Sequence, residues 1–118
     1  MSHIVAIETR VHDAAALTMA CRRLGLAEPV QGSVRLFSAD ATGLSVQLPG
    51  WRYPIVVDTA RGSIKYDNYN GKWGDLEKLG RLLQSYAVEK AKIEARKQGY
   101  YVHEQSRQDG SIVLQIAT

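Results

Sequence analysis

The segment from Trp51 to Trp73 holds the side chains of this 118-residue chain that are best suited to binding. Five of the nine aromatic residues lie in it and four basic residues are interleaved with them: Trp51, Tyr53, Tyr66, Tyr69, Trp73, Arg52, Arg61, Lys65 and Lys72. Such a surface can stack single-stranded bases and hold their phosphates, and Trp, Tyr and Arg are also enriched at protein–protein hot spots. A structural alternative is that the two indoles close the end of the core, with their N–H groups bonded to loop carbonyls. We predict a partner-binding surface of Trp51, Arg52, Tyr66, Tyr69, Lys72 and Trp73.

The histidines and the single cysteine show no spacing typical of a metal site or a catalytic centre. They are His3, His12, His103 and Cys21. No helix carries two histidines four residues apart, and no Cys-x-x-Cys occurs. Cys21 falls in the apolar stripe of a predicted helix, where a free cysteine acts as a small hydrophobic residue. We therefore expect no metal, no cofactor and no catalytic residue.

The acidic residues offer two weaker candidates for chemistry. Asp58 and Asp67 flank one predicted hairpin and could approach each other, but a general acid and base need surroundings that separate their pKa values. Glu94 follows Ala87 and Ala91 along one side of a long helix, so we expect it to be partly buried and hydrogen-bonded to a strand. The glycine-rich phosphate-binding motifs Gly-x-Gly-x-x-Gly and Gly-x-x-x-x-Gly-Lys-Ser/Thr are both missing, so any nucleotide chemistry would come from a partner.

Two helices and seven strands follow from the spacing of apolar residues and from the turn residues between them. Asp13 is placed to cap a helix over 14–24, which Gly25 ends. A longer helix over 75–98 is ended by Gly99. Turn-forming residues over 67–74 predict a loop that carries Tyr69 and Trp73. The predicted strands are 2–9, 34–37, 44–48, 55–57, 63–66, 100–105 and 111–116.

The order of these elements is β-α-β-β-β-β-α-β-β, and its short hairpin links predict an α+β fold. We expect a single domain over 1–118, with a mainly antiparallel sheet and both helices packed on one face. Apolar positions in every element fall on one face, which predicts a common core. Its members are expected to include Leu17, Leu24, Val56, Leu83, Ile112 and Leu114.

Parts of the chain resemble a family known only as a domain of unknown function. The opening 1–4, the loop 66–69, the pair 73–74 and the run 86–116 carry the resemblance, with Lys97-Gln98-Gly99-Tyr100 and Asp109-Gly110-Ser111-Ile112 in the last run. Together they look like the domain of unknown function 1257 family, whose plastid members are called hypothetical chloroplast reading frame 35. The resemblance implies an accessory protein without an assigned reaction. Members of that family tend to be encoded near an AAA-type ATPase and ferredoxin-like proteins. The resemblance therefore implies such proteins as partners.

The net charge of +3 does not by itself indicate nucleic-acid binding. All of the excess lies in residues 61–118, and much of it at the end of the long helix, where basic side chains complement the helix dipole. No stretch of 18 apolar residues occurs, so we expect no membrane span, and a lone cysteine fits a reducing cytoplasm. We expect a non-enzymatic accessory or adaptor domain that docks on a larger protein. The alternative is a single-stranded nucleic-acid-binding module, and the oligomeric state stays open.

Overall fold

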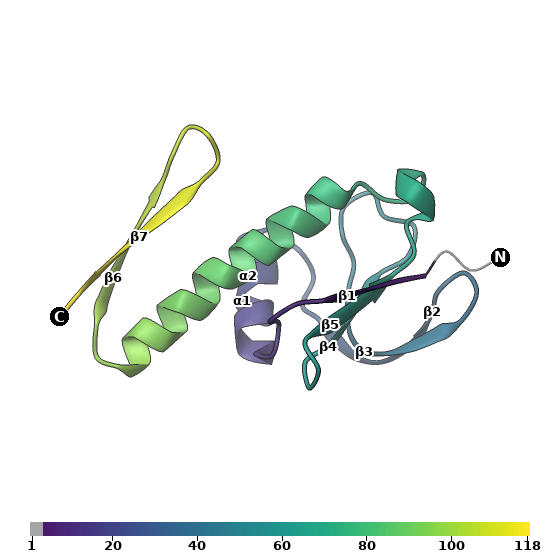
Figure 1. Ribbon diagram of the computed structural model, residues 1–118, viewed down its shortest axis with the longest axis horizontal. Helices are drawn as coiled ribbons and strands as arrows, with labels where there is room; N and C mark the ends of the chain where they lie inside the picture. The colour runs from purple at the N-terminus through teal and green to yellow at the C-terminus, as the bar shows by residue number, and fades with distance from the viewer. Residues whose placement is uncertain (1–3) are drawn as a thin grey trace.

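The computed structural model describes residues 4–118 and contains two antiparallel sheets and two main helices (Figure 1). The elements are β1 (Val5–Glu8), α1 (Ala14–Arg23), β2 (Val30–Arg35), β3 (Asp40–Val46), β4 (Ile55–Asp58), β5 (Ser63–Tyr66), the short 3-10 helix η1 (Tyr69–Gly71), α2 (Leu76–Lys97), β6 (Tyr101–Ser106) and β7 (Ile112–Ala117). Their order matches the predicted one. The α+β fold with a mainly antiparallel sheet is therefore confirmed.

The larger sheet has five strands in the order β1-β5-β4-β3-β2, and every neighbouring pair is antiparallel. Val57 lies opposite Ile64 in the pairing of β4 with β5. Because side chains alternate along a strand, these two point to one face and Val56 points to the other. The predicted strand 2–9 begins at residues outside the described range, and its visible part is β1.

Both main helices begin at an aspartate and end beside a glycine. The Asp13 carboxylate accepts hydrogen bonds from the N–H groups of Ala15 and Ala16 at 2.9 and 3.2 Å, which satisfies free donors at the start of α1. Gly25 follows α1 with a φ of 71°, a conformation that glycine adopts without strain. The 22-residue α2 carries many charges, and no helix in residues 4–118 is long and apolar enough to cross a membrane.

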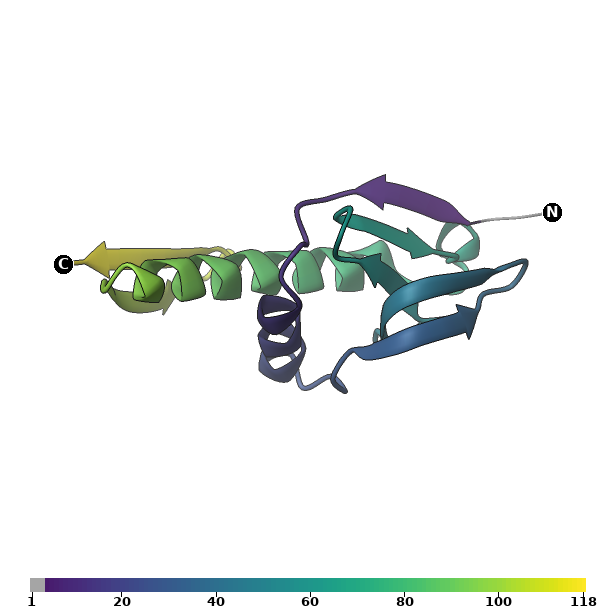
Figure 2. The same ribbon diagram turned by 90° about the horizontal axis from the view of Figure 1, so that it is seen from below.

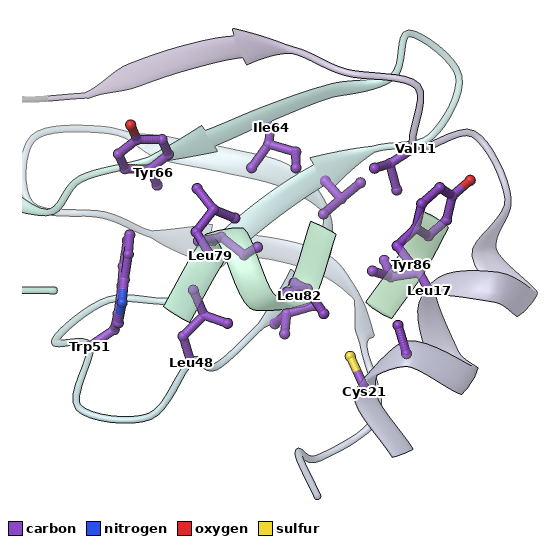
Figure 3. Close-up of a cluster of buried hydrophobic side chains, with 14 of the residues drawn as sticks. Val11, Leu17, Cys21, Leu48, Trp51, Ile64, Tyr66, Leu79, Leu82 and Tyr86 are labelled. Carbon is purple, nitrogen blue, oxygen red and sulfur yellow. The ribbon is translucent and has the colours of Figure 1, made fainter. Parts of the chain in front are cut away.

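The main core lies between the larger sheet and the two helices (Figures 2 and 3). Leu17 of α1 and Leu82 of α2 are each 1% exposed and belong to one cluster with Ile55 and Ile64 of the sheet. Figure 3 shows Trp51 and Tyr66 at one end of this cluster, and Leu17 and Tyr86 at the other. The helices thus cover one face of the sheet, as predicted. Leu83 is half-buried and packs against the same cluster.

The opposite face of the sheet has a smaller apolar cluster of its own. Val56 is buried there with Leu36 and Ala41, and Tyr53 packs against them. The prediction that Val56 shares a core with Leu17 is therefore wrong. Strand alternation explains the error, since Ile55 and Val57 already occupy the face toward the helices.

The last two strands form a separate two-stranded sheet and do not join the larger one. Figures 1 and 2 show this β6–β7 hairpin beside the C-terminal half of α2, away from the larger sheet. Ile112 and Leu114 are only half-buried there, and Leu24 is 37% exposed at the end of α1. These three residues are therefore not part of the predicted common core. A 22-residue helix explains the separation, because it extends past the edge of a sheet whose strands are four to seven residues long.

A group of charged side chains joins the hairpin to both helices. Arg23 at the end of α1 makes two short bonds to the Glu104 carboxylate, at 2.6 and 2.7 Å, and a third to Glu89 of α2 at 3.2 Å. These bonds hold the pKa of Glu104 below its usual value. Lys92 lies 3.6 Å from Glu89 and 3.7 Å from Glu104. Ion pairs thus join the hairpin to both helices, beside the half-buried apolar side chains of Ile112 and Leu114.

Candidate functional site

Two of the predicted partner-binding aromatics are parts of the core. Trp51 is 5% exposed and Tyr66 is 7% exposed, and their rings meet edge to face at 5.6 Å. The indole N–H of Trp51 donates to the backbone oxygen of Asp75 at 3.1 Å, as expected for an indole that closes a core. Gly74 packs directly on this indole, because a Cβ atom there would lie 2.3 Å from Trp51 Cδ2. Trp51 and Tyr66 therefore stay out of the candidate surface.

Three other aromatic residues converge on Trp73. Tyr69 stacks on Trp73 at 4.7 Å between ring centroids, and Tyr53 meets it edge to face at 5.7 Å. Phe37 packs on the same indole at 5.2 Å and is 47% exposed. We call these four residues, with Arg52 and Lys72, the Trp73 cluster.

Phe37 was not predicted as a member of this surface, and the structure shows why. The strand predicted over 34–37 is instead β2, which begins at Val30 and ends at Arg35. It ends there because the N–H of Leu36 bonds to the oxygen of Ala39 at 2.9 Å and turns the chain. Phe37 therefore stands at a hairpin turn, where an aromatic side chain has little of its own chain to cover it. Ser38 and Asp40 are turn-forming residues that could have placed Phe37 at a hairpin turn.

Arg52 and Lys72 supply the positive charge of the Trp73 cluster. The guanidinium carbon of Arg52 lies 4.9 Å from the centroid of a Trp73 ring and 5.6 Å from that of Tyr53. The Lys72 ammonium lies 4.7 Å from the centre of the Tyr69 ring. These are cation–π distances. The cluster is thus an apolar surface with two cations resting on it.

The loop 67–74 that carries Tyr69 and Trp73 has a defined conformation. The backbone oxygen of Asn68 accepts from the N–H groups of Gly71 and Trp73 at 3.0 and 2.9 Å, and its side-chain amide donates to Gly74. Arg52 N–H donates to Trp73 O at 2.8 Å and ties the loop to the connection between β3 and β4. The rings are therefore presented by a braced loop.

This loop also contains strained and costly features. Tyr69 and Asn70 are consecutive non-glycine residues with φ of 46° and 52°, a conformation that costs L residues ~1–2 kcal/mol each. Asp67 is fully buried, and its Oδ2 has no hydrogen-bond partner among residues 4–118. Both features reduce stability, and such features cluster at binding sites.

Neither acidic candidate makes the contact considered for it from the sequence. Asp58 and Asp67 do not approach each other, because Asp58 pairs with Ser63 at one end of β5 and Asp67 follows its other end. The Glu94 side chain is 46% exposed and pairs along α2 with Lys90 at 2.8 Å, so the prediction of a bond to a strand is wrong. The buried carboxylate of α2 is instead Glu89.

The histidines and the cysteine lie apart from one another. His12 Nδ1 is 2.9 Å from the backbone oxygen of Thr59, His103 is exposed on β6, and His3 lies outside the described residues. Burial, together with the charge of Glu28, raises the pKa of the Cys21 thiol to about 11. Residues 4–118 contain no group of three or more His, Cys, Asp or Glu residues that could hold a metal ion.

An apolar groove of about 530 Å³ runs between the chain after β1 and one side of α2. Val11, Leu83 and Ala87 line it, and Lys90 is the charged group on its α2 side. This ammonium is already held by Asp13 at 3.0 Å and Glu94 at 2.8 Å. Arg10, Thr9 and Tyr86 also line the groove, so its polar groups come from both sides while its walls are largely apolar.

The Trp73 cluster remains the surface with the most distinctive chemistry. Comparisons of the chain with protein-family models, with curated proteins and with solved structures give no match.

Proposed function

We propose that this chain is a non-enzymatic accessory protein that docks on a larger protein through the Trp73 cluster. The observation that carries the proposal is the convergence of four rings from three separate segments, of which Phe37 is exposed and the other three are half-buried. Phe37 comes from the β2–β3 turn, Tyr53 precedes β4, and Tyr69 and Trp73 come from the loop before α2. Large rings gathered at a surface are typical of an interaction site.

The main core is closed without the Trp73 cluster, although Tyr53 packs on the smaller cluster of Val56 on the other face of the sheet. Trp51 and Tyr66 already fill that end of the main core, on the face toward the helices. Because Phe37 is 47% exposed, it forgoes roughly half of the ~1.5–3 kcal/mol that full burial of such a side chain typically contributes. A protein partner that covers these rings would recover that free energy, and the aromatic and Arg composition fits a hot spot.

The chemistry of the cluster suggests the character of its partner. Arg52 and Lys72 favour a partner surface with apolar groups at its centre and carboxylates or carbonyl oxygens around them. The resemblance to the domain of unknown function 1257 family suggests an AAA-type ATPase, or else a ferredoxin-like protein. An acidic patch on such a partner is the natural complement. We also propose that the chain acts in the cytoplasm.

The alternative is a single-stranded nucleic-acid-binding module. It is favoured by the same mixture of rings and cations. The geometry favours it less, because Trp73 already has Tyr69 stacked on it and Arg52 above it. A base would have to displace one of them before it could stack.

The experiment measures the affinity of the purified chain for the proposed partner, an AAA-type ATPase from the same organism, and for a single-stranded oligonucleotide. We expect Trp73→Ala to weaken the protein complex by about 2 kcal/mol or more, roughly thirtyfold in Kd. Val30→Ala is the matched control, because Val30 is 64% exposed and lies at the other end of β2 from Phe37. If the original chain, Trp73→Ala and Val30→Ala bind the ATPase with equal affinity, the proposal is refuted. Oligonucleotide binding that falls steeply with salt and depends on Trp73 would favour the alternative.

A further inference from the structure

The β6–β7 hairpin leaves two strand edges unpaired among the described residues. An isolated two-stranded sheet is at best marginally stable in water. Its main supports are the end of α2 and the bonds from Arg23 to Glu104. Figures 1 and 2 show no other element along the outside of the hairpin. The question is what these edges pair with.

The hydrogen-bond pattern identifies the free groups of β7. The N–H of Arg107 donates to the oxygen of Ser111 at 2.9 Å, so this pair is hydrogen-bonded across the hairpin. Hydrogen-bonded pairs alternate along an antiparallel ladder. In the observed register, the next such pairs are Gln105 with Val113 and His103 with Gln115. The residues of β7 between them direct their N–H and C=O groups away from β6, and these residues are Ile112, Leu114 and Ile116.

This edge carries none of the features that normally block pairing. Exposed edge strands are usually protected by a lysine, a proline or another charged side chain. The sequence of β7 is Ile-Val-Leu-Gln-Ile-Ala, which contains no charge and no proline. Its inner face is also incompletely covered, since Ile116 is 51% exposed. The strand is thus open along its edge and apolar on its inner face.

We propose that β7 pairs antiparallel with β7 of a second copy of this chain, around a twofold axis at Leu114. In this register Leu114 lies opposite its own copy and Ile112 lies opposite Ile116 of that copy. Every outward N–H and C=O of these three residues then has a partner. The three side chains share one face, so the aliphatic strip of one copy continues into that of the other. The result is a four-stranded sheet with an isologous interface.

Two features favour a second copy of β7 over other pairings. A strand without charges can lie against its own copy with no like charges opposed. A twofold pairing of β6 with a second β6, centred on Glu104, would instead place two carboxylates opposite each other. Each of them is already bound by Arg23 of its own chain. The self-complementary order Ile-x-Leu-x-Ile also places equal side chains symmetrically around the axis.

The first test is the mass of the full chain in solution, measured by light scattering over a range of concentrations. We expect a dimer of twice the 13.1 kDa chain mass. Ile116→Pro removes an outward N–H but no bond to β6, and we expect it to weaken the dimer about tenfold or more. Ile116→Val keeps that N–H and is expected to dimerise like the original chain. A monomer at every concentration, or a dimer that Ile116→Pro leaves unchanged, overturns the proposal.

A cross-link tests the register separately, even where Ile116→Pro perturbs the hairpin. Leu114→Cys places two thiols opposite each other at a Cα separation of roughly 5.5 Å, within reach of a disulfide. Val113→Cys places its two copies roughly 8 Å apart, beyond that reach. The buried Cys21, whose pKa is raised to about 11, is not expected to compete. Cross-linked dimer from Leu114→Cys but not from Val113→Cys supports the pairing, and equal yields contradict it.

Discussion

Replacement of Gly74 by alanine adds a methyl group where the ring of Trp51 lies. The new Cβ would be 2.3 Å from Cδ2, 2.5 Å from Cε2 and 2.7 Å from Cγ of the indole, all far inside van der Waals contact. Gly74 has no positive φ, so the change introduces no backbone strain of its own. The indole cannot move freely, because Tyr66 packs on it and its N–H is bonded to Asp75. The effect should therefore be almost wholly steric.

Overpacking of this kind typically costs about 1–3 kcal/mol. Displacement of the indole also loses its hydrogen bond to Asp75, which contributes about 0.5–1.5 kcal/mol. We expect Gly74→Ala to lower the free energy of unfolding by about 2–4 kcal/mol. Urea unfolding followed by circular dichroism measures this change, and an unchanged m-value would assign it to the folded state.

Gly80 provides the matched control, since it lies exposed in α2 and a Cβ there meets nothing within 4 Å. Gly80→Ala should raise stability by roughly 0.5–1 kcal/mol, because alanine favours the helix. Trp51→Leu makes room for the methyl group, so the double variant with Gly74→Ala should lose less than the sum of the single losses. If Gly74→Ala costs less than about half a kcal/mol, Trp51 does not pack on this glycine and the reasoning is wrong.

Two further predictions concern the core and the hairpin. Leu82→Ala should lower the free energy of unfolding by about 2–5 kcal/mol in urea, because Leu82 is 1% exposed. Leu76→Ala is the control in the same helix; Leu76 is 51% exposed, so this change should alter stability by less than about 0.5 kcal/mol. The bonds from Arg23 lower the pKa of Glu104 in the folded protein. The stability that these bonds contribute is therefore fully present above the ordinary carboxyl pKa, and it is lost as the pH falls through the lowered pKa. Amide exchange in β6 and β7 should therefore accelerate relative to the larger sheet at acid pH. Glu104→Gln should remove that pH dependence. If the pH dependence of exchange is the same in this variant, the Glu104 carboxylate does not hold the hairpin.

Local chemistry made much of the fold predictable. The aspartate before α1 and the glycine after it act within one helical turn, so their roles are legible in the sequence. The β4–β5 hairpin is equally local, because its strands are joined by the short turn 59–62. Loop 67–74 was predicted as a connection, and the structure adds the single turn η1 within it.

Tertiary placement was less predictable. The hairpin of β6 and β7 has the same alternating pattern as a strand pair of the larger sheet, and nothing in that pattern says which sheet it joins. Tyr66 could have been assigned to the core, because it is two residues from Ile64 and shares its face. Trp51 is buried and packs on Gly74, whereas Trp73 is half-exposed and packs on Phe37. Such contacts between distant segments are not visible in local spacing.

The most direct test of the proposed docking surface compares Trp73→Ala with Trp51→Ala, each measured for unfolding and for binding to the proposed partner, an AAA-type ATPase. Trp51→Ala should cost about 3–5 kcal/mol of stability, because that indole fills the core. Trp73→Ala should leave a folded protein whose stability falls by much less, while its Kd rises roughly thirtyfold. Equal stability losses in the two variants, with the Kd of folded Trp73→Ala unchanged, would contradict the account and make the Trp73 cluster a second core.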